Sequence, residues 1–198
     1  MKSNICDLAG QKEKLDAVLA EVEKCASYNN LSNKSALRLR LLAEELVGML
    51  PALLEHTTGS FWLENDGSKY ELHVSVRALE TGFDTREKLL MLSTTGKNAA
   101  AVGIMGKIRA AAESLLFSSD EDIVFSDFSD YEMDATNYNH SWSLKLYTDR
   151  IRSRAESEAA AAEAWDELEK SIVAQLADDV VVGIKGRQVD IIVRKEFA

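Results

Sequence analysis

The chain has 198 residues, of which 46% are apolar, so it is long enough to bury the core of one ordinary globular domain. Its 33 acidic and 23 basic side chains give a formal net charge of -10, which argues against a general nucleic-acid surface and against binding to anionic membranes. Cys6 and Cys25 lack companion Cys or His residues at metal-ligand spacing, and no apolar run approaches the roughly 18 residues of a membrane span, so we expect free thiols and a cytoplasmic protein.

The first third of the chain carries the signature of two helices. Apolar residues recur at three- and four-residue intervals over residues 5–27, which predicts an amphipathic helix. Ser32 or Asn33 can cap a second helix that starts near residue 34, and Pro51 is expected to kink that helix or to end it within a turn. We therefore expect an N-terminal amphipathic helix in residues 1–31 and a single α+β domain in residues 32–198.

The middle of the chain changes character several times. Apolar and polar residues alternate in a predicted hairpin of residues 60–64 and 69–78, with its turn at Asn65-Asp66-Gly67. Helices are expected at 86–92 and 98–117. Residues 119–134 contain seven carboxylates and no basic residue, which predicts a solvated acidic loop with a strand at Ile123–Phe125; the alternative is a docking surface for a basic partner.

The C-terminal part is predicted to form a strand at 142–147, a continuous helix at 150–177, and a hairpin of residues 180–184 and 189–193. Tight turns join the paired strands of both hairpins, which is typical of antiparallel pairing. The expected fold class is α+β: a two-layer α/β sandwich with a mostly antiparallel sheet and helices on one face.

The stretch Ser93–Lys97 is the most suggestive of a ligand site. Hydroxyl groups, a glycine and a lysine lead into a helix, and free amides at a helix N-terminus favour a bound phosphate. It is not a Walker A loop, because Met91 and Asn98 stand where that motif needs Gly and Ser or Thr. The plainer interpretation is a helix cap followed by a small-residue face, where Gly103 and Gly106 admit a close neighbour.

Several short motifs follow one another in a suggestive order. A helix with adjacent glutamates and a hairpin are followed by Leu79–Phe83, by Thr94–Lys97 and by Gly103–Met105. In this order they resemble the Bergerat-fold (GHKL) ATPases, the group of the gyrase, heat-shock chaperone, histidine-kinase and MutL ATPase domains. Within that group the chain looks most like the anti-sigma-factor serine kinases. The resemblance covers residues 35–148, and residues 150–198 form a C-terminal helix and hairpin beyond it.

The resemblance implies roles for residues on the second helix. Glu44 or Glu45 matches the family's catalytic glutamate, which helps to activate water or a substrate hydroxyl. The family has a magnesium-binding asparagine four residues later, where this chain has Gly48 and Met49. The resemblance therefore implies a site without its Mg²⁺ ligand and with little or no turnover.

The resemblance also implies a site for ATP or ADP. Glu80 and Gly82 keep the spacing of the family's adenine-binding aspartate and glycine, with a longer carboxylate. The residues that correspond to the family's phosphate-binding lid and helix start are Thr94, Thr95, Lys97, Gly103 and Gly106.

Each of these residues also has a purely structural interpretation. Arg40 stands four residues before Glu44, a spacing that forms ion pairs on any helix. Glu80 and Gly82 fit an ordinary turn after a strand. His73 falls on the polar phase of its strand, which predicts a solvent-facing imidazole.

Two functions remain open from the sequence. The first is a nucleotide-binding regulatory protein of the histidine-kinase-like ATPase type, whose enzymatic activity the sequence leaves undecided. The second is a non-enzymatic interaction module that keeps the fold, has lost the nucleotide, and binds a protein partner or a second copy of itself. Kinase activity toward a protein serine is a third option.

Overall fold

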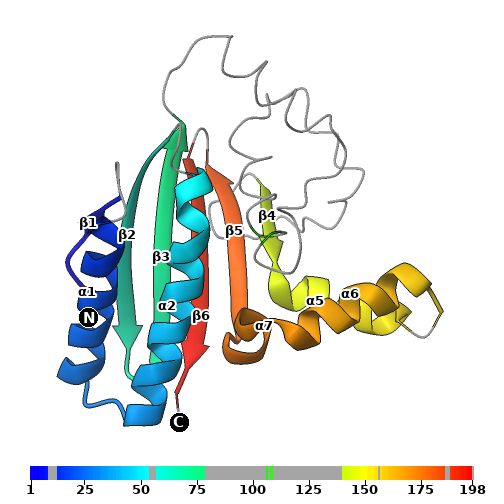
Figure 1. Ribbon diagram of the computed structural model, residues 1–198, viewed down its shortest axis with the longest axis horizontal. Helices are drawn as coiled ribbons and strands as arrows, with labels where there is room; N and C mark the ends of the chain where they lie inside the picture. Colours follow the sequence, from blue (N-terminus) through cyan, green and yellow to red (C-terminus); the bar gives the residue numbers. More distant parts are fainter. Residues whose placement is uncertain are drawn as a thin grey trace.

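The computed structural model describes residues 1–8, 13–53, 57–78, 106, 108, 140–155, 157–185 and 188–197. These residues form a two-layer α+β sandwich in which α1 and α2 lie across one face of an antiparallel sheet, as the sequence predicted (Figure 1). The elements are β1 (Cys6–Asp7), α1 (Glu13–Tyr28), α2 (Asn33–Leu53), β2 (Thr57–Asp66), β3 (Lys69–Ala78), β4 (His140–Ser143), α5 (Leu144–Arg154), α6 (Ala159–Lys170), α7 (Ile172–Leu176), β5 (Asp179–Lys185) and β6 (Gln188–Glu196).

The sheet has six described strands in the order β1-β2-β3-β6-β5-β4, and every neighbouring pair is antiparallel. Two hairpins, β2–β3 and β5–β6, are joined through β3 and β6 in its centre. In the first hairpin Asp66 pairs with Lys69, so that Gly67 and Ser68 form a two-residue loop. Gly67 has a φ of +58°, a conformation that glycine adopts without the steric cost of a Cβ.

Alternation along the strands gives the sheet two different faces. Phe61, Leu63, Leu72 and Val74 are fully buried and belong to the same core as the apolar residues of α1 and α2. Their chain neighbours point to the other side because side chains alternate along a strand. We call that other side, away from α1 and α2, the distal face.

The apolar stripe of the first helix is buried within the chain. Val18, Val22 and Cys25 of α1 belong to the core, together with Leu42 and Leu46 of α2. Burying apolar surface stabilises the folded chain by about 25 cal/mol for each Å², so this packing is the main stabilising contribution of α1. The stripe therefore has its partner inside the same polypeptide.

The prediction that the first helix begins near residue 5 was wrong. Cys6–Asp7 is a short edge strand, β1, which pairs with Phe61 and Ser60 of β2. Backbone hydrogen bonds also hold the residues before and after β1 against β2. The Leu8 amide donates to the Gly59 carbonyl at 2.8 Å, and the Ser3 amide donates to the Leu63 carbonyl at 2.8 Å. Pairing with a neighbouring strand thus outweighs the local helical pattern.

Two predictions for the C-terminal part were wrong: the strand at 142–147 and the continuous helix at 150–177. The strand β4 ends at Ser143, whose hydroxyl accepts a hydrogen bond from the Leu146 amide and starts α5. Asp179 accepts hydrogen bonds from the Ser143 hydroxyl and the Lys145 amide, both at 3.0 Å. Further along, Ser171 caps α7, so three helices replace the single predicted one.

Other predictions are confirmed or lie outside the described residues. The second helix starts at Asn33 and ends at Leu53, two residues after Pro51, and the C-terminal hairpin is present. Within the predicted helix 98–117 only Gly106 and Ile108 are described, and both are helical and buried. The predicted helix 86–92 and the acidic loop 119–134 with its strand lie outside. None of the helices in the described ranges is long and apolar enough to cross a membrane.

Leucines on α2 offer a test of this packing. Leu42 is fully buried in the core, whereas Leu37 on the same helix is 57% exposed. We expect Leu42→Ala to lower the free energy of unfolding by about 2–5 kcal/mol, because it leaves a cavity in a closely packed layer. The matched change Leu37→Ala should alter it by no more than about 0.5 kcal/mol. Urea denaturation of both variants measures the difference, and equal losses would contradict the described core.

Candidate functional site

The glutamates predicted on the second helix have different surroundings. Glu44 accepts a hydrogen bond from Arg40 Nε at 2.8 Å, and Arg40 also forms an ion pair with Glu23 of α1. The i,i+4 ion pair that the sequence suggested is therefore confirmed. Glu45 is half-buried and forms no ion pair with another residue that the structure describes. Within the described ranges, therefore, Arg40 holds Glu44 and leaves Glu45 unengaged.

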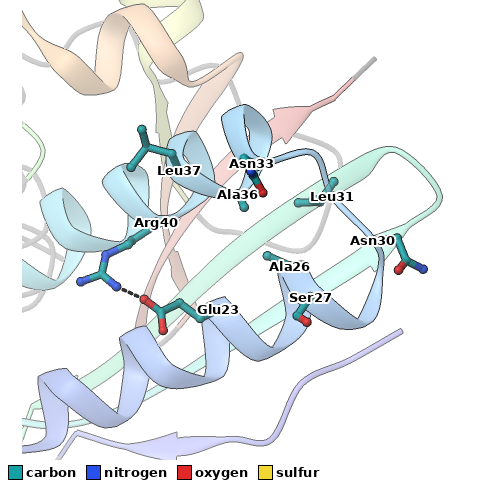
Figure 2. A pocket seen from close by; sticks show the side chains of 9 residues that line it. All are labelled: Glu23, Ala26, Ser27, Asn30, Leu31, Asn33, Ala36, Leu37 and Arg40. Atoms are coloured by element: carbon teal, nitrogen blue, oxygen red, sulfur yellow. Dashed lines mark ion pairs between the residues drawn. The ribbon is translucent and has the colours of Figure 1, made fainter.

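The Arg40 ion pairs lie at one side of a groove between α1 and α2. Figure 2 shows the groove, which has a volume of about 600 Å³ and combines small and apolar side chains with polar ones. Its lining residues are Glu23, Ala26, Ser27, Asn30, Leu31, Asn33, Ala36, Leu37 and Arg40. Of the residues predicted to hold a nucleotide, Gly106 is the one within the described ranges, and it does not line this groove.

Most of the predicted nucleotide-binding residues lie outside the described part of the chain: Glu80, Gly82, Thr94, Thr95, Lys97 and Gly103. Gly106 is described and is a buried helical residue. On α2, Gly48 occupies the position four residues after Glu44, and a Cβ built there meets no atom within 4 Å. The space beside Gly48 is therefore open.

A group of titratable side chains lies close together on the distal face of the sheet. The register places Glu64 directly opposite Glu71, and Trp62 directly opposite His73. One ligand atom from each of Glu64, Glu71 and His73 lies within 4.8 Å of the others. We call these three residues the distal cluster; sequence reasoning did not identify it.

Cationic and aromatic neighbours hold the two carboxylates of the distal cluster. Glu64 Oε1 accepts a hydrogen bond from Trp62 Nε1 at 2.8 Å and lies 3.0 Å from Lys2 Nζ. Glu71 Oε1 accepts a hydrogen bond from Arg194 Nε at 3.0 Å. The hydrogen bond from Lys2, with that from Trp62, lowers the pKa of Glu64 below its ordinary value. Glu64 is consequently a carboxylate at neutral pH.

The prediction that the His73 imidazole faces solvent was wrong. Its ring stacks on the Trp62 ring, with centroids 4.9 Å apart and planes 4° from parallel, and its side chain is only 12% exposed. His73 Nε2 lies 3.2 Å from Glu71 Oε2 without hydrogen-bond geometry, so this buried nitrogen has no hydrogen-bond partner. An unpaired buried nitrogen is unusual and calls for a physical explanation.

Burial lowers the pKa of His73 below its ordinary value of 6.5, and the negative charges of Glu71 and Glu64 only partly oppose this effect. The imidazole is therefore neutral at pH 7. In the unfolded chain the same imidazole takes up a proton near pH 6.5, at a higher pH than in the native state.

This difference predicts a pH dependence of stability. As the pH falls below 6.5 the unfolded chain binds a proton that native His73 does not, so the free energy of unfolding should decrease until the native imidazole is also protonated. Urea denaturation between pH 7.5 and 5, in the presence of a metal chelator, measures this decrease in the free energy of unfolding. The His73→Gln variant should show a weaker dependence of that free energy on pH. A His73 pKa at or above 6.5, measured by NMR, would contradict the prediction.

The two cysteines are free thiols, as expected. Cys25 is buried and Cys6 is partly buried. Burial raises the pKa of both thiols. Raised values leave little thiolate at neutral pH, so neither cysteine has the character of a reactive nucleophile.

No protein-family model matches this chain, and no curated protein is significantly similar to it.

Proposed function

We propose that the chain is a nucleotide-binding regulatory protein of the histidine-kinase-like ATPase type, which binds ATP or ADP and has little or no turnover. The observation that supports this proposal best is the arrangement of α2 and the β2–β3 hairpin. Their C-terminal ends lie at the same end of the sheet, and the segment with the nucleotide-binding motifs begins there (Figure 1).

Chain connectivity limits how far apart these motifs can be. Leu53, at the end of α2, is four positions before Thr57, which pairs with Ala78 at the end of β3. Glu80 follows Ala78 by two positions in the sequence, and two extended residues span at most about 7 Å. Glu45 is eight residues before Leu53, or about 12 Å along the helix. The proposed site would thus combine the second half of α2 with the start of the following segment.

The expectation of low turnover rests on the residues of α2. Arg40 engages Glu44, which leaves Glu45 as the candidate for the family's catalytic glutamate. Gly48 and Met49 stand where the family has its magnesium ligand, and neither side chain offers an oxygen. A bound nucleotide would therefore keep its phosphate charges without a protein-held Mg²⁺, which removes a main source of transition-state stabilisation.

Calorimetric titration of the full chain with ATP and with ADP tests the proposal. We expect binding with little dependence on Mg²⁺, a raised melting temperature, and at most marginal phosphate release. Lys97→Ala should weaken binding because it removes the proposed phosphate cation. Lys69→Ala, at the opposite end of β3, is the matched control and should leave binding unchanged.

The proposal fails if millimolar nucleotide gives neither heat nor a thermal shift. If nucleotide binds but Lys97→Ala has no effect, the phosphate-binding role of Lys97 fails.

The second candidate is a non-enzymatic protein-interaction module without a nucleotide. One observation favours it: the Glu44 carboxylate is held by Arg40, which also pairs with Glu23, so this part of α2 makes structural contacts in place of catalytic ones. Its partner would be a protein, including a second copy of this chain. Light scattering against concentration tests the homodimer, and a monomeric mass throughout would exclude it.

A further inference from the structure

We propose that Glu64, Glu71 and His73, the distal cluster, form a binding site for a divalent transition-metal cation of the Zn²⁺ class. The site is independent of the proposed nucleotide site. It uses residues of one hairpin, β2–β3, on the face of the sheet opposite α1 and α2.

The spacing of the three ligand atoms is close to what a metal needs. Tetrahedral Zn²⁺ binds nitrogen and oxygen at about 2.1 Å, which places neighbouring ligand atoms about 3.4 Å apart. His73 Nε2 and Glu71 Oε2 are already 3.2 Å apart, and all three ligand atoms lie within 4.8 Å of one another. A small rotation of the Glu64 side chain, which is 42% exposed, would complete the set.

Each proposed ligand keeps one atom that makes no hydrogen bond to another described residue, and each has at least one supporting contact. Glu64 and Glu71 use Oε1 to accept from Trp62 and Arg194, which leaves Oε2 of each for the cation. The His73 ring is fixed by its stack on Trp62, with Nε2 3.2 Å from Glu71 Oε2. Metal ligands in proteins commonly have such second contacts, which orient them toward the ion.

A cation would also explain two unfavourable features of the cluster. Glu64 and Glu71 are like charges directly opposite each other in an antiparallel pair, an arrangement that destabilises a sheet. His73 Nε2 is buried without a hydrogen-bond partner. A divalent cation among them would neutralise the repulsion and give the neutral imidazole nitrogen a ligand bond.

The ligand types restrict the metal. Ca²⁺ takes six to eight oxygen ligands, and Mg²⁺ prefers octahedral oxygen coordination with several waters. One imidazole with two carboxylates suits Zn²⁺ and its first-row neighbours, with a further position left for water. Lys2 and Arg194 offset part of the cluster's negative charge, so we expect a weaker site than a buried structural zinc centre.

Titration of the untagged full chain with Zn²⁺, after removal of metals with EDTA, tests the site. We expect one ion per chain by calorimetry and a higher melting temperature with Zn²⁺. His73→Gln and Glu71→Gln should each weaken binding at least tenfold. His140→Gln, which changes a histidine on β4, is the matched control and should bind as the unchanged chain does. Absence of heat at millimolar Zn²⁺, or equal affinity in His73→Gln, would overturn the proposal.

Trp62 provides a second measurement that does not depend on folding of the His73 variant. Because its ring stacks on His73, Co²⁺ bound at the cluster should quench part of the tryptophan fluorescence of the unchanged chain. The quenching midpoint should match the Co²⁺ concentration at half-saturation by calorimetry, and the quenched component should be absent in Trp62→Phe. Binding of Co²⁺ without quenching, or quenching that persists in Trp62→Phe, would place the ion elsewhere and overturn the proposal.

Discussion

The antiparallel pairing of β3 with β6 is the interaction on which the rest of the structure depends. It joins residues 69–77 to residues 188–196 and brings the two hairpins, far apart in the sequence, into one sheet. An isolated two-stranded hairpin is at best marginally stable in water, and only the joined sheet offers α1 and α2 a surface wide enough to cover their apolar faces. The core and the distal face therefore both depend on this long-range pairing.

The same register determines the core and the distal cluster. Leu72 and Val193 are paired across β3 and β6 and are buried under the helices, while their neighbours Glu71 and Arg194 pair on the distal face. A slip of one residue would turn Glu71 toward the core and Leu72 toward the distal face, because side chains alternate with a period of two. The free energy that stabilises the core therefore also fixes the geometry of the cluster.

Local patterns predicted the parts of the fold that local forces determine. Periodicity identified α2 and both hairpins, and the i,i+4 spacing identified the Arg40–Glu44 ion pair. The edge strand β1 depends on pairing with β2, and the start of α5 depends in part on the carboxylate of Asp179. Both partners are distant in the sequence, so a local pattern does not reveal them. The alternation of polar and apolar residues predicted which face of the sheet His73 lies on. It did not predict that the imidazole is mostly buried, which results from the stack on Trp62. Placing the two-residue loop at Gly67-Ser68 would have revealed that Glu64 opposes Glu71.

The positions of the two proposed sites show that one cannot stand in for the other. The distal cluster cannot take the place of a magnesium ligand beside Gly48, because α2 lies on one face of the sheet and the cluster on the other. Glu71 is also seven residues from Ala78, about 24 Å along the strand from the end where the nucleotide motifs begin. No side chain spans that distance. A cation at the cluster would therefore stabilise the β2–β3 hairpin near its turn, too far from the proposed nucleotide site to neutralise phosphates there.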